Sequence, residues 1–341
     1  MKKIGSIFLL IITLTAIAET ISEKNSFAQL NPKRLITQVS SEIPVRDISG
    51  FNGTITSLAV SEVHNLLLVS SRDGTITGIN LDDLQPQYTE TLIEQPRSLV
   101  ITPDQNDFIT ASNKDIRWFT LLDGTEGKRW RGHAGKITKL ALSPTNEMLA
   151  SISAEDGTTK LWNYKEGDLI TTFGDHTGPL TSVTFSPDGK QLVTAASGTD
   201  RTLKFWDTET LELIKTSPQQ PGYIYDIAIT SDSNQLIAAV RNTIKVWDVN
   251  TGEELLTIKA ADLDLNGIAV SPDNNLVATA NKEGTISLID LTTRKVVKTL
   301  KGHRGWVTSV YFSDDGQLLY SGAEDKTVKI WNLSNNQEVI N

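Results

Sequence analysis

Residues 301–333 read KGHRGWVTSVYFSDDGQLLYSGAEDKTVKIWNL and contain three short runs, each next to a turn signal. In 307–312 apolar residues alternate with small polar ones, and 318–321 and 328–331 follow the same alternation. An Asp-Gly pair at 315–316 supplies one of the reversals. Runs of this kind, separated by Asp-Gly-type turns, predict antiparallel strands joined by hairpins. One such small sheet cannot bury both of its faces, so the chain should contain neighbours built in the same way.

The same unit recurs along the chain. Counting back from His303, the equivalent positions lie 41 to 44 residues apart, at Ala261, Gln220, His176, His133, Leu92 and Phe51. The end of the third run, Trp331, has earlier equivalents at Ile289, Trp247, Trp206, Trp162, Phe119 and Ile79. One further short strand lies between consecutive units, for example at 296–300. Four strands in about forty residues correspond to one blade of a β-propeller. The sequence therefore predicts an all-β fold, a seven-bladed β-propeller of four-stranded antiparallel blades that occupies 42–341.

The two ends of the repeated region align with each other. Residues 46–58 match 298–310 without a gap, so 44–48 should form the outer strand of a blade whose other three strands come from the C-terminal end. An N-terminal strand in this place would close the last blade and would protect a sheet edge that could otherwise pair with another chain. Residues 337–341 then become a surplus end.

The repeated cues resemble the WD40 repeat family over roughly residues 43–333. Histidines precede the first strand of three units, at Gly132-His133, Asp175-His176 and Gly302-His303. Turns of the Ser-Pro-Asp type stand at 186–188 and 271–273, and Trp-Asp or Trp-Asn pairs end the third strands at 162–163, 206–207, 247–248 and 331–332. The resemblance implies a propeller that serves as a platform for protein or peptide partners. Because fold does not fix function, this step rests on the family likeness.

The resemblance also implies that each of these histidines belongs to a buried polar chain inside one blade. Carried onto this sequence, the three chains consist of His133, Ser151, Asp156 and Trp162; His176, Thr194, Asp200 and Trp206; and His303, Ser321, Asp325 and Trp331. A histidine and an aspartate near a serine also suggest a hydrolytic triad. The set recurs three times in structural register, however, and the chain has no G-x-S-x-G nucleophile motif. A structural role is therefore expected, and no catalytic residue is predicted.

The N-terminus differs in composition from the rest of the chain. Lys2-Lys3 is followed by an apolar run over 4–18 that ends in Ala16-Ile17-Ala18. This pattern predicts a secretory signal peptide over 1–18, although an uncleaved anchor helix is the alternative. Residues 19–41 are polar and predict a tether. We expect an exported protein, periplasmic or secreted, with no membrane span after signal cleavage.

Composition excludes several other classes of site. The chain has no cysteine, which removes disulfides, zinc thiolate sites and thiol nucleophiles. Its formal net charge of −9 argues against a nucleic-acid partner. No phosphate-binding loop or zinc-binding helix motif is present, so no cofactor is predicted.

One segment resembles the start of a calcium loop. Asp262, Asp264 and Asn266 alternate before a glycine, and Asp273 stands at the twelfth position. In the repeat register, however, Leu265 takes the place of a core residue and the next residues belong to a strand. The backbone could not then curl around an ion, so the segment is only a weak candidate and no metal site is expected.

A binding surface is easier to predict. The resemblance implies that residues around the start of each innermost strand reach the top face of the ring, where this chain has Tyr223, Tyr225, Trp306, Arg97, Lys136 and Asp264. Residues beside the second hairpin, Arg72, Arg241 and Glu324, should rim the same face. Aromatic residues beside arginines are typical of interaction hot spots, although the aromatic rings could instead cover the edge of the core. The predicted function is a non-catalytic scaffold outside the cytoplasm; the alternative is a hydrolase or small-ligand binder that uses the central channel.

Overall fold

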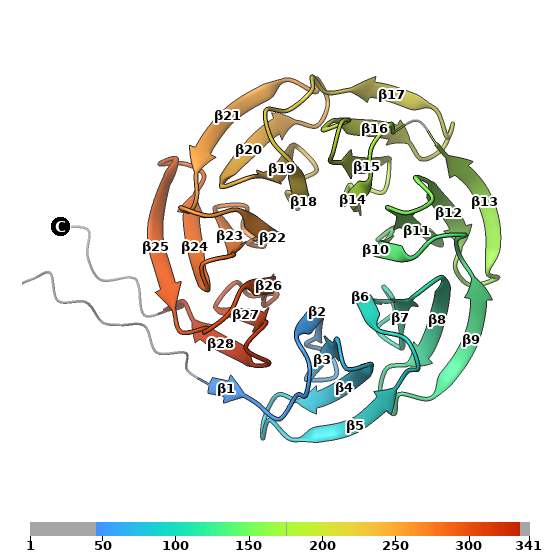
Figure 1. Ribbon diagram of the computed structural model, residues 1–341, viewed down its shortest axis with the longest axis vertical. Coiled ribbons are helices and arrows are strands. Elements are labelled where there is room, and N and C mark those ends of the chain that lie inside the picture. The colour runs from blue at the N-terminus through green and yellow to red at the C-terminus, as the bar shows by residue number, and fades with distance from the viewer. Residues whose placement is uncertain (1–45, 175, 335–341) are drawn as a thin grey trace, which may run out of the picture. The chain divides into compact units, whose positions relative to one another are not determined.

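The computed structural model describes residues 46–174 and 176–334, which form twenty-eight β-strands in seven four-stranded antiparallel sheets. The sheets stand as blades around a central opening (Figure 1). The prediction of an all-β, seven-bladed propeller is confirmed. The predicted signal peptide (1–18), the predicted tether (19–41) and the surplus C-terminal end (337–341) lie outside the described residues.

Each blade contributes one strand to every layer of the ring, from the opening outward. The innermost strands are β2 (Ile55–Ser61), β6 (Pro96–Ile101), β10 (Ile137–Leu142), β14 (Leu180–Phe185), β18 (Ile224–Ile229), β22 (Leu265–Val270) and β26 (Val307–Phe312). The second strands are β3 (Leu66–Ser71), β7 (Asp107–Ser112), β11 (Met148–Ser153), β15 (Gln191–Ala196), β19 (Gln235–Val240), β23 (Leu276–Asn281) and β27 (Leu318–Ala323). Blades 1 to 7 are numbered in this order.

The two outer layers follow the same order. The third strands are β4 (Thr75–Asn80), β8 (Asp115–Thr120), β12 (Thr159–Asn163), β16 (Leu203–Asp207), β20 (Thr243–Asp248), β24 (Thr285–Asp290) and β28 (Val328–Asn332). The outermost strands of blades 1 to 6 are β5 (Pro86–Thr91), β9 (Glu126–Arg131), β13 (Asp168–Phe173), β17 (Leu213–Thr216), β21 (Glu254–Lys259) and β25 (Lys295–Lys301). Blade 7 takes its outermost strand from the other end of the chain.

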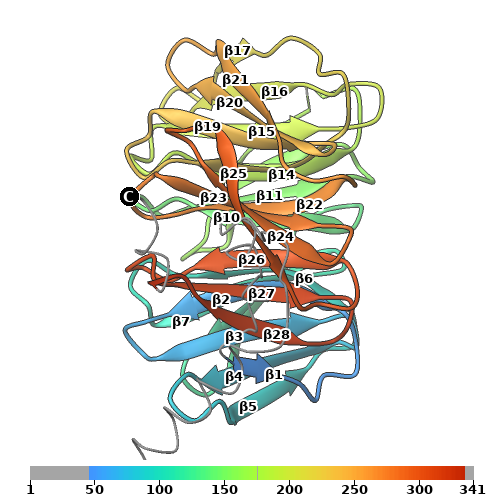
Figure 2. The same ribbon diagram turned by 90° about the vertical axis from the view of Figure 1, so that its left-hand side faces the viewer.

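That strand is β1 (Arg46–Ile48), which pairs with β28 and closes the ring as predicted (Figure 2). Asp47 stands opposite Lys329, and the Lys329 Nζ donates to Asp47 Oδ2 at 2.6 Å. Ile48 is buried in the cluster between blades 7 and 1. The closing strand therefore adds a charge pair and an apolar side chain to the backbone pairing.

The core lies between neighbouring blades rather than inside any one of them. In the blade 4–blade 5 interface, Trp247 packs in one cluster with Val193 and Phe205 of the preceding blade. Trp331 of blade 7 packs in the same way against Leu288 of blade 6. Each sheet therefore covers one face of the next, and closure into a ring lets every blade bury both of its faces.

Every innermost strand has a β-bulge after its first residue. In blade 1, for example, Ile55 pairs with Ser71 and Ser57 with Ser70, so no residue of the second strand stands opposite Thr56 in the register. A bulge of this kind leaves one extra residue unpaired and re-aims its side chain. The seven bulge residues line the central cavity and are Thr56, Arg97, Thr138, Thr181, Tyr225, Asn266 and Thr308.

One face of the ring carries the loops that lead into the innermost strands. Antiparallel pairing places these loops beside the hairpins that join the second and third strands. Their backbones are hydrogen-bonded together: the N–H groups of Arg241, Lys282 and Glu324 donate to carbonyl groups in the entering loops at 2.9–3.0 Å. We call this face, formed by the entering loops and these hairpins, the top face.

Candidate functional site

The structure contains the three polar chains inside blades 3, 4 and 7. In blade 7, His303 Nε2 lies 2.7 Å from Ser321 Oγ, His303 Nδ1 lies 3.0 Å from Asp325 Oδ2, and Trp331 Nε1 donates to Ser321 Oγ at 2.8 Å. Blade 3 repeats these contacts at 2.7, 3.1 and 2.8 Å with His133, Ser151, Asp156 and Trp162. Blade 4 repeats them at 2.8, 3.2 and 3.0 Å with His176, Thr194, Asp200 and Trp206.

Burial sets the electrostatics of these chains. Burial lowers the pKa of His133 and His303 and outweighs the attraction of the neighbouring carboxylates. Burial alone would raise the pKa of Asp156, but the Gly135 N–H, the Thr158 hydroxyl and His133 together lower that pKa to about 2. A neutral imidazole beside an ionised carboxylate is therefore the resting state of the chain.

The same burial separates these residues from any substrate. Ser151, Thr194 and Ser321 have no exposed surface, and the side chains of His133 and His303 have none either. A nucleophilic hydroxyl must reach the substrate atom that it attacks. These polar networks therefore have the residue types of a catalytic triad, but no substrate can reach them. Their role is to stabilise the blades.

A cluster of aromatic and charged side chains occupies the top face of blades 5, 6 and 7. We call it the aromatic cluster, and it consists of Tyr223, Tyr225, Arg241, Asp264, Lys282 and Trp306. Tyr225 Oη donates to Asp264 Oδ2 at 2.7 Å, and the rings of Tyr223 and Tyr225 meet edge to face with centroids 6.5 Å apart. The Lys282 Nζ lies 4.3 Å from the Tyr225 ring centroid and 5.4 Å from that of Trp306.

Charge and exposure divide this cluster into a centre and a rim. Asp264 lies at the centre, 3.9 Å from both Arg241 Nε and Lys282 Nζ. Burial, followed by the hydrogen bond to Asp264, raises the pKa of Tyr225 to about 12, so this phenol stays protonated and donates. Tyr223 is 52% exposed and Trp306 48% exposed, which leaves two large rings facing solvent. The centre is thus fixed by polar contacts while the rim is available for contact.

Sequence reasoning did not single out Lys282. This residue stands in the hairpin between the second and third strands of blade 6, at the position that Arg241 and Glu324 hold in blades 5 and 7. The repeat register that selected those two residues would also have selected Lys282.

Three of the predicted surface residues lie away from the aromatic cluster. Arg97 lines the central cavity, and Lys136 pairs with Glu155 on blade 3 with 3.5 Å between Nζ and Oε1. Arg72 is exposed in the β3–β4 hairpin of blade 1. Arg241 is therefore the predicted arginine that lies beside the aromatic rings, since Arg72 belongs to blade 1 and Arg97 to blade 2.

The structure does not bring the weak calcium candidates together. Asp262 pairs with Lys259 at 2.9 Å, Asp264 accepts the Tyr225 hydroxyl, and Asn266 Nδ2 donates to the Val307 carbonyl at 2.8 Å. The intervening backbone is already part of the strand β22. Within 46–174 and 176–334, no group of three or more His, Asp or Glu side chains is placed to hold a metal ion.

Comparison with known proteins agrees with this geometry. The family model described as "WD domain, G-beta repeat" matches 42–77, 124–163, 167–207 and 294–332, and the model of the anaphase-promoting complex subunit 4 WD40 domain matches 225–312. An uncharacterized WD repeat-containing protein of Synechocystis sp. is 45% identical over 255 residues, which are 74% of this chain and 73% of that protein. The chain belongs to the WD40 repeat family.

More distant relatives of this WD40 propeller are larger or match over a shorter stretch. Nuclear distribution protein PAC1 of Arthroderma otae is 28% identical over 212 residues, 59% of this chain and 37% of that protein. Target of rapamycin complex subunit LST8 of Saccharomyces cerevisiae is 35% identical over 94 residues, 27% of this chain and 31% of that protein. The WD40 chain thus spans about a third of the length of these two relatives. In the part of it that the structure describes, no helix is long and apolar enough to cross a bilayer.

Proposed function

We propose that this WD40 propeller is a non-catalytic scaffold that binds a protein or peptide through the aromatic cluster of the top face. The observation that carries the proposal is the pair of half-exposed rings, Tyr223 and Trp306, beside a centre that is already ordered. Tyrosine, tryptophan and arginine are the residues in which binding energy concentrates at protein interfaces.

The contacts within the cluster reduce the cost of binding. Lys282 is held between two rings and Tyr225 is held by Asp264, so these side chains lose little freedom when a partner arrives. Ordering a flexible side chain at an interface costs about 0.5–1.5 kcal/mol, and a preorganised one avoids most of that cost. The ordered centre therefore adds little entropic cost when a partner packs against the rim rings.

The relatives support an assembly role without naming a partner. One of them is named a subunit of the target of rapamycin complex. The central channel gives less support to a hydrolase. Among the described residues its lining includes one carboxylate, Asp226, and no histidine, so these residues offer no acid–base pair.

A peptide selection would test the binding proposal. A displayed library of random peptides is selected against the full chain and then against Tyr223→Ala/Trp306→Ala. Val63→Ala/Leu122→Ala serves as the matched control, since both side chains are exposed in turns at the opposite face. Enriched peptides should bind the control like the wild type and bind the aromatic variant at least about tenfold more weakly. Equal binding to both variants, or no enrichment at all, would refute the proposal.

We also propose that the scaffold acts outside the cytoplasm, with residues 1–18 as the export signal. The support is the sequence pattern of a basic start, an apolar run and small residues at its end. Expression of the full gene in a bacterial host, followed by cell fractionation and N-terminal sequencing, tests this. The mature chain should begin after Ala18, or after Ala28 at a second possible cleavage point, Ser26-Phe27-Ala28, and should leave the cytoplasm. A chain that keeps residues 1–18 in the soluble cytoplasmic fraction would contradict the proposal.

A further inference from the structure

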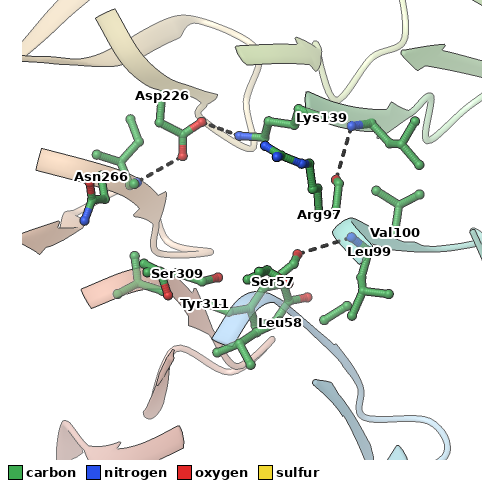
Figure 3. A pocket seen from close by; sticks show the side chains of 18 of the residues that line it. Ser57, Leu58, Arg97, Leu99, Val100, Lys139, Asp226, Asn266, Ser309 and Tyr311 are labelled. Atoms are coloured by element: carbon green, nitrogen blue, oxygen red, sulfur yellow. Dashed lines mark hydrogen bonds and ion pairs between the residues drawn. The ribbon is translucent and has the colours of Figure 1, made fainter. Parts of the chain in front are cut away.

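The central channel is a polar cavity of about 520 Å³ that is lined by the innermost strands. Its lining contains three charged side chains, which are Arg97, Lys139 and Asp226. They come from blades 2, 3 and 5 and point into the opening from different sides (Figure 3). A cavity of this size is within the usual range for small-molecule sites.

The seven repeats show which channel residues the scaffold itself requires. The residue after the bulge is serine in blades 1, 2, 4 and 7, and three of these hydroxyls accept a backbone N–H from a neighbouring blade. Ser57 accepts from Leu99, Ser98 from Leu140, and Ser182 from Ile227, at 3.1–3.3 Å. In blade 5, Asp226 takes the same place and its Oδ2 accepts the Ile268 N–H at 3.2 Å. These four residues join the blades.

Lys139 stands at the same position in blade 3 but cannot accept a hydrogen bond. Its Nζ instead reaches past blade 4 to Asp226 and donates to Ser182 Oγ at 3.0 Å. Asp226 Oδ1 also accepts the Ser182 hydroxyl at 2.7 Å and the Ile227 N–H at 2.9 Å. The carboxylate is therefore fully used, and it holds the lysine inside the opening.

Arg97 departs from the repeat in a second way. It is the bulge residue of blade 2, where four other blades have threonine. Its guanidinium makes no hydrogen bond or ion pair with any of the described residues, and the residue is exposed. The channel thus has two cations against one carboxylate, in a chain with a formal net charge of −9. The fold does not need this arginine, and no acid of the described chain neutralises it.

We propose that the central channel binds an oxyanion, the carboxylate or phosphate group of a small molecule, with Arg97 as its direct contact and Lys139 as a second cation. A guanidinium presents paired N–H donors that match the two oxygens of such a group. Lys139 is held in place by Asp226, so its charge is already ordered.

Titration calorimetry on the full chain tests the site with succinate, inorganic phosphate and neutral succinamide as probes. Arg97→Gln removes the proposed contact, and Arg131→Gln removes the same charge from the outer strand of the same blade. At least one anion should bind with a stoichiometry of one and weaken tenfold or more in Arg97→Gln, while Arg131→Gln stays like the wild type and succinamide does not bind. Because the Arg97 guanidinium has no hydrogen-bond or ion-pair partner among the described residues, its replacement should leave the melting temperature unchanged.

Two results would overturn the proposal. One is the absence of saturable binding of either anion up to about 10 mM, well above the concentrations at which specific sites fill. The other is an equal loss in Arg97→Gln and Arg131→Gln, which would mean attraction by net charge alone. An end-blocked peptide with one glutamate separates the two sources of a carboxylate: binding of that peptide but not of succinate or phosphate would reject a small-molecule ligand. The Tyr223→Ala/Trp306→Ala variant should keep anion binding, so this result is independent of the top-face proposal.

Discussion

At the residue scale, a neutral His303 satisfies every donor and acceptor in the hydrogen-bonded series Trp331, Ser321, His303 and Asp325. The indole N–H donates to Ser321 Oγ, the Ser321 hydroxyl can donate to a neutral His303 Nε2, and the His303 Nδ1–H can donate to Asp325. A protonated histidine would place a second donor on the serine oxygen and leave the serine hydrogen without an acceptor. This polar network of blade 7 therefore requires a neutral histidine.

The pH dependence of stability follows from this state. Burial lowers the pKa of His133 and His303 below 6.5, so the unfolded chain binds more protons than the folded one as the pH falls through 6.5. The free energy of unfolding should then decrease from about pH 6.5 downward, and chemical denaturation between about pH 8 and pH 5 measures it. In His133→Gln/His303→Gln most of that decrease should disappear. A double variant with the wild-type slope would contradict the assignment.

A second loss should occur in stronger acid. The pKa of Asp156 and of Asp200 is lowered from 3.8 to about 2 in the folded chain: burial opposes the shift, and hydrogen bonds from backbone and threonine groups outweigh burial. Stability from these carboxylates is complete above pH 3.8 and is lost as the pH falls from there toward 2.

Blade 5 lacks the hydroxyl acceptor that Trp162, Trp206 and Trp331 use in blades 3, 4 and 7. Trp247 is fully buried, and its Nε1 has no hydrogen-bond partner among the described residues. Ala238 occupies the second-strand position that holds a serine in blades 3 and 7 and a threonine in blade 4. Ala238→Ser should therefore give the indole a partner and raise the free energy of unfolding by about 0.5–1.5 kcal/mol.

The neighbouring alanine provides the control for that substitution. Ala239 is equally buried but packs in the cluster on the other face of the sheet. Ala239→Ser should bury a hydroxyl without the indole and lower stability. Equal effects of the two variants in urea denaturation would show that the indole does not respond to the new hydroxyl.

At the scale of the elements, β1 should matter more than its length suggests. Deletion of 42–49 removes this strand and exposes the outer edge of β28. It also removes Asp47, the partner of Lys329, and Lys329 is only 6% exposed. Loss of the buried Ile48 alone should cost about 1.5–3 kcal/mol. Deletion of 337–341, which lie outside the described residues, is the matched control. The first deletion should lower the thermal midpoint far more than the second, and the reverse order would contradict closure by β1.

The repeat explains why so much of the fold could be predicted. The same pattern occurs in seven copies, so the strands of blade 2 and blade 6, whose own sequence signals are weak, can be assigned by alignment with the other repeats. The positions equivalent to Trp331 all pair with the second strand in one register, as in Leu319–Trp331 and Val277–Ile289. Closure by β1 was predictable for the same reason, because 46–58 align with 298–310.

The grouping of side chains on the top face was less predictable. Repeat register tells which residues reach this face but not which of their side chains contact one another. Arg97 was expected on the top face and lines the channel, while Lys136 pairs with Glu155 on blade 3, away from the aromatic rings. The bulges were also missed, because one unpaired residue near the start of a short strand leaves most of the apolar–polar alternation unchanged.

At the scale of the whole molecule, Asp226 connects four blades. Its carboxylate accepts hydrogen bonds from Ser182 of blade 4 and the Ile268 N–H of blade 6, and it pairs with Lys139 of blade 3. Asp226→Ala leaves these donors without an acceptor and should lower the free energy of unfolding by about 2–4 kcal/mol. Asp226→Asn keeps one acceptor oxygen, so its free energy of unfolding should lie between those of the wild type and the alanine variant. A loss below about 1 kcal/mol in the alanine variant would show that the blades hold together without this residue.

Closure by β1 also determines the order in which the blades can be completed during synthesis and folding. Arg46 is made early, but its partner Ile330 follows it on the chain by almost the whole length of the propeller. The earliest strand must therefore stay unpaired until synthesis has delivered β28, and six blades can assemble before the seventh has its outer strand. Such long-range pairing is slow, because the chain must close a large loop before the contact forms. A ribosome-bound chain truncated before Val328 should thus hold folded early blades and an open ring.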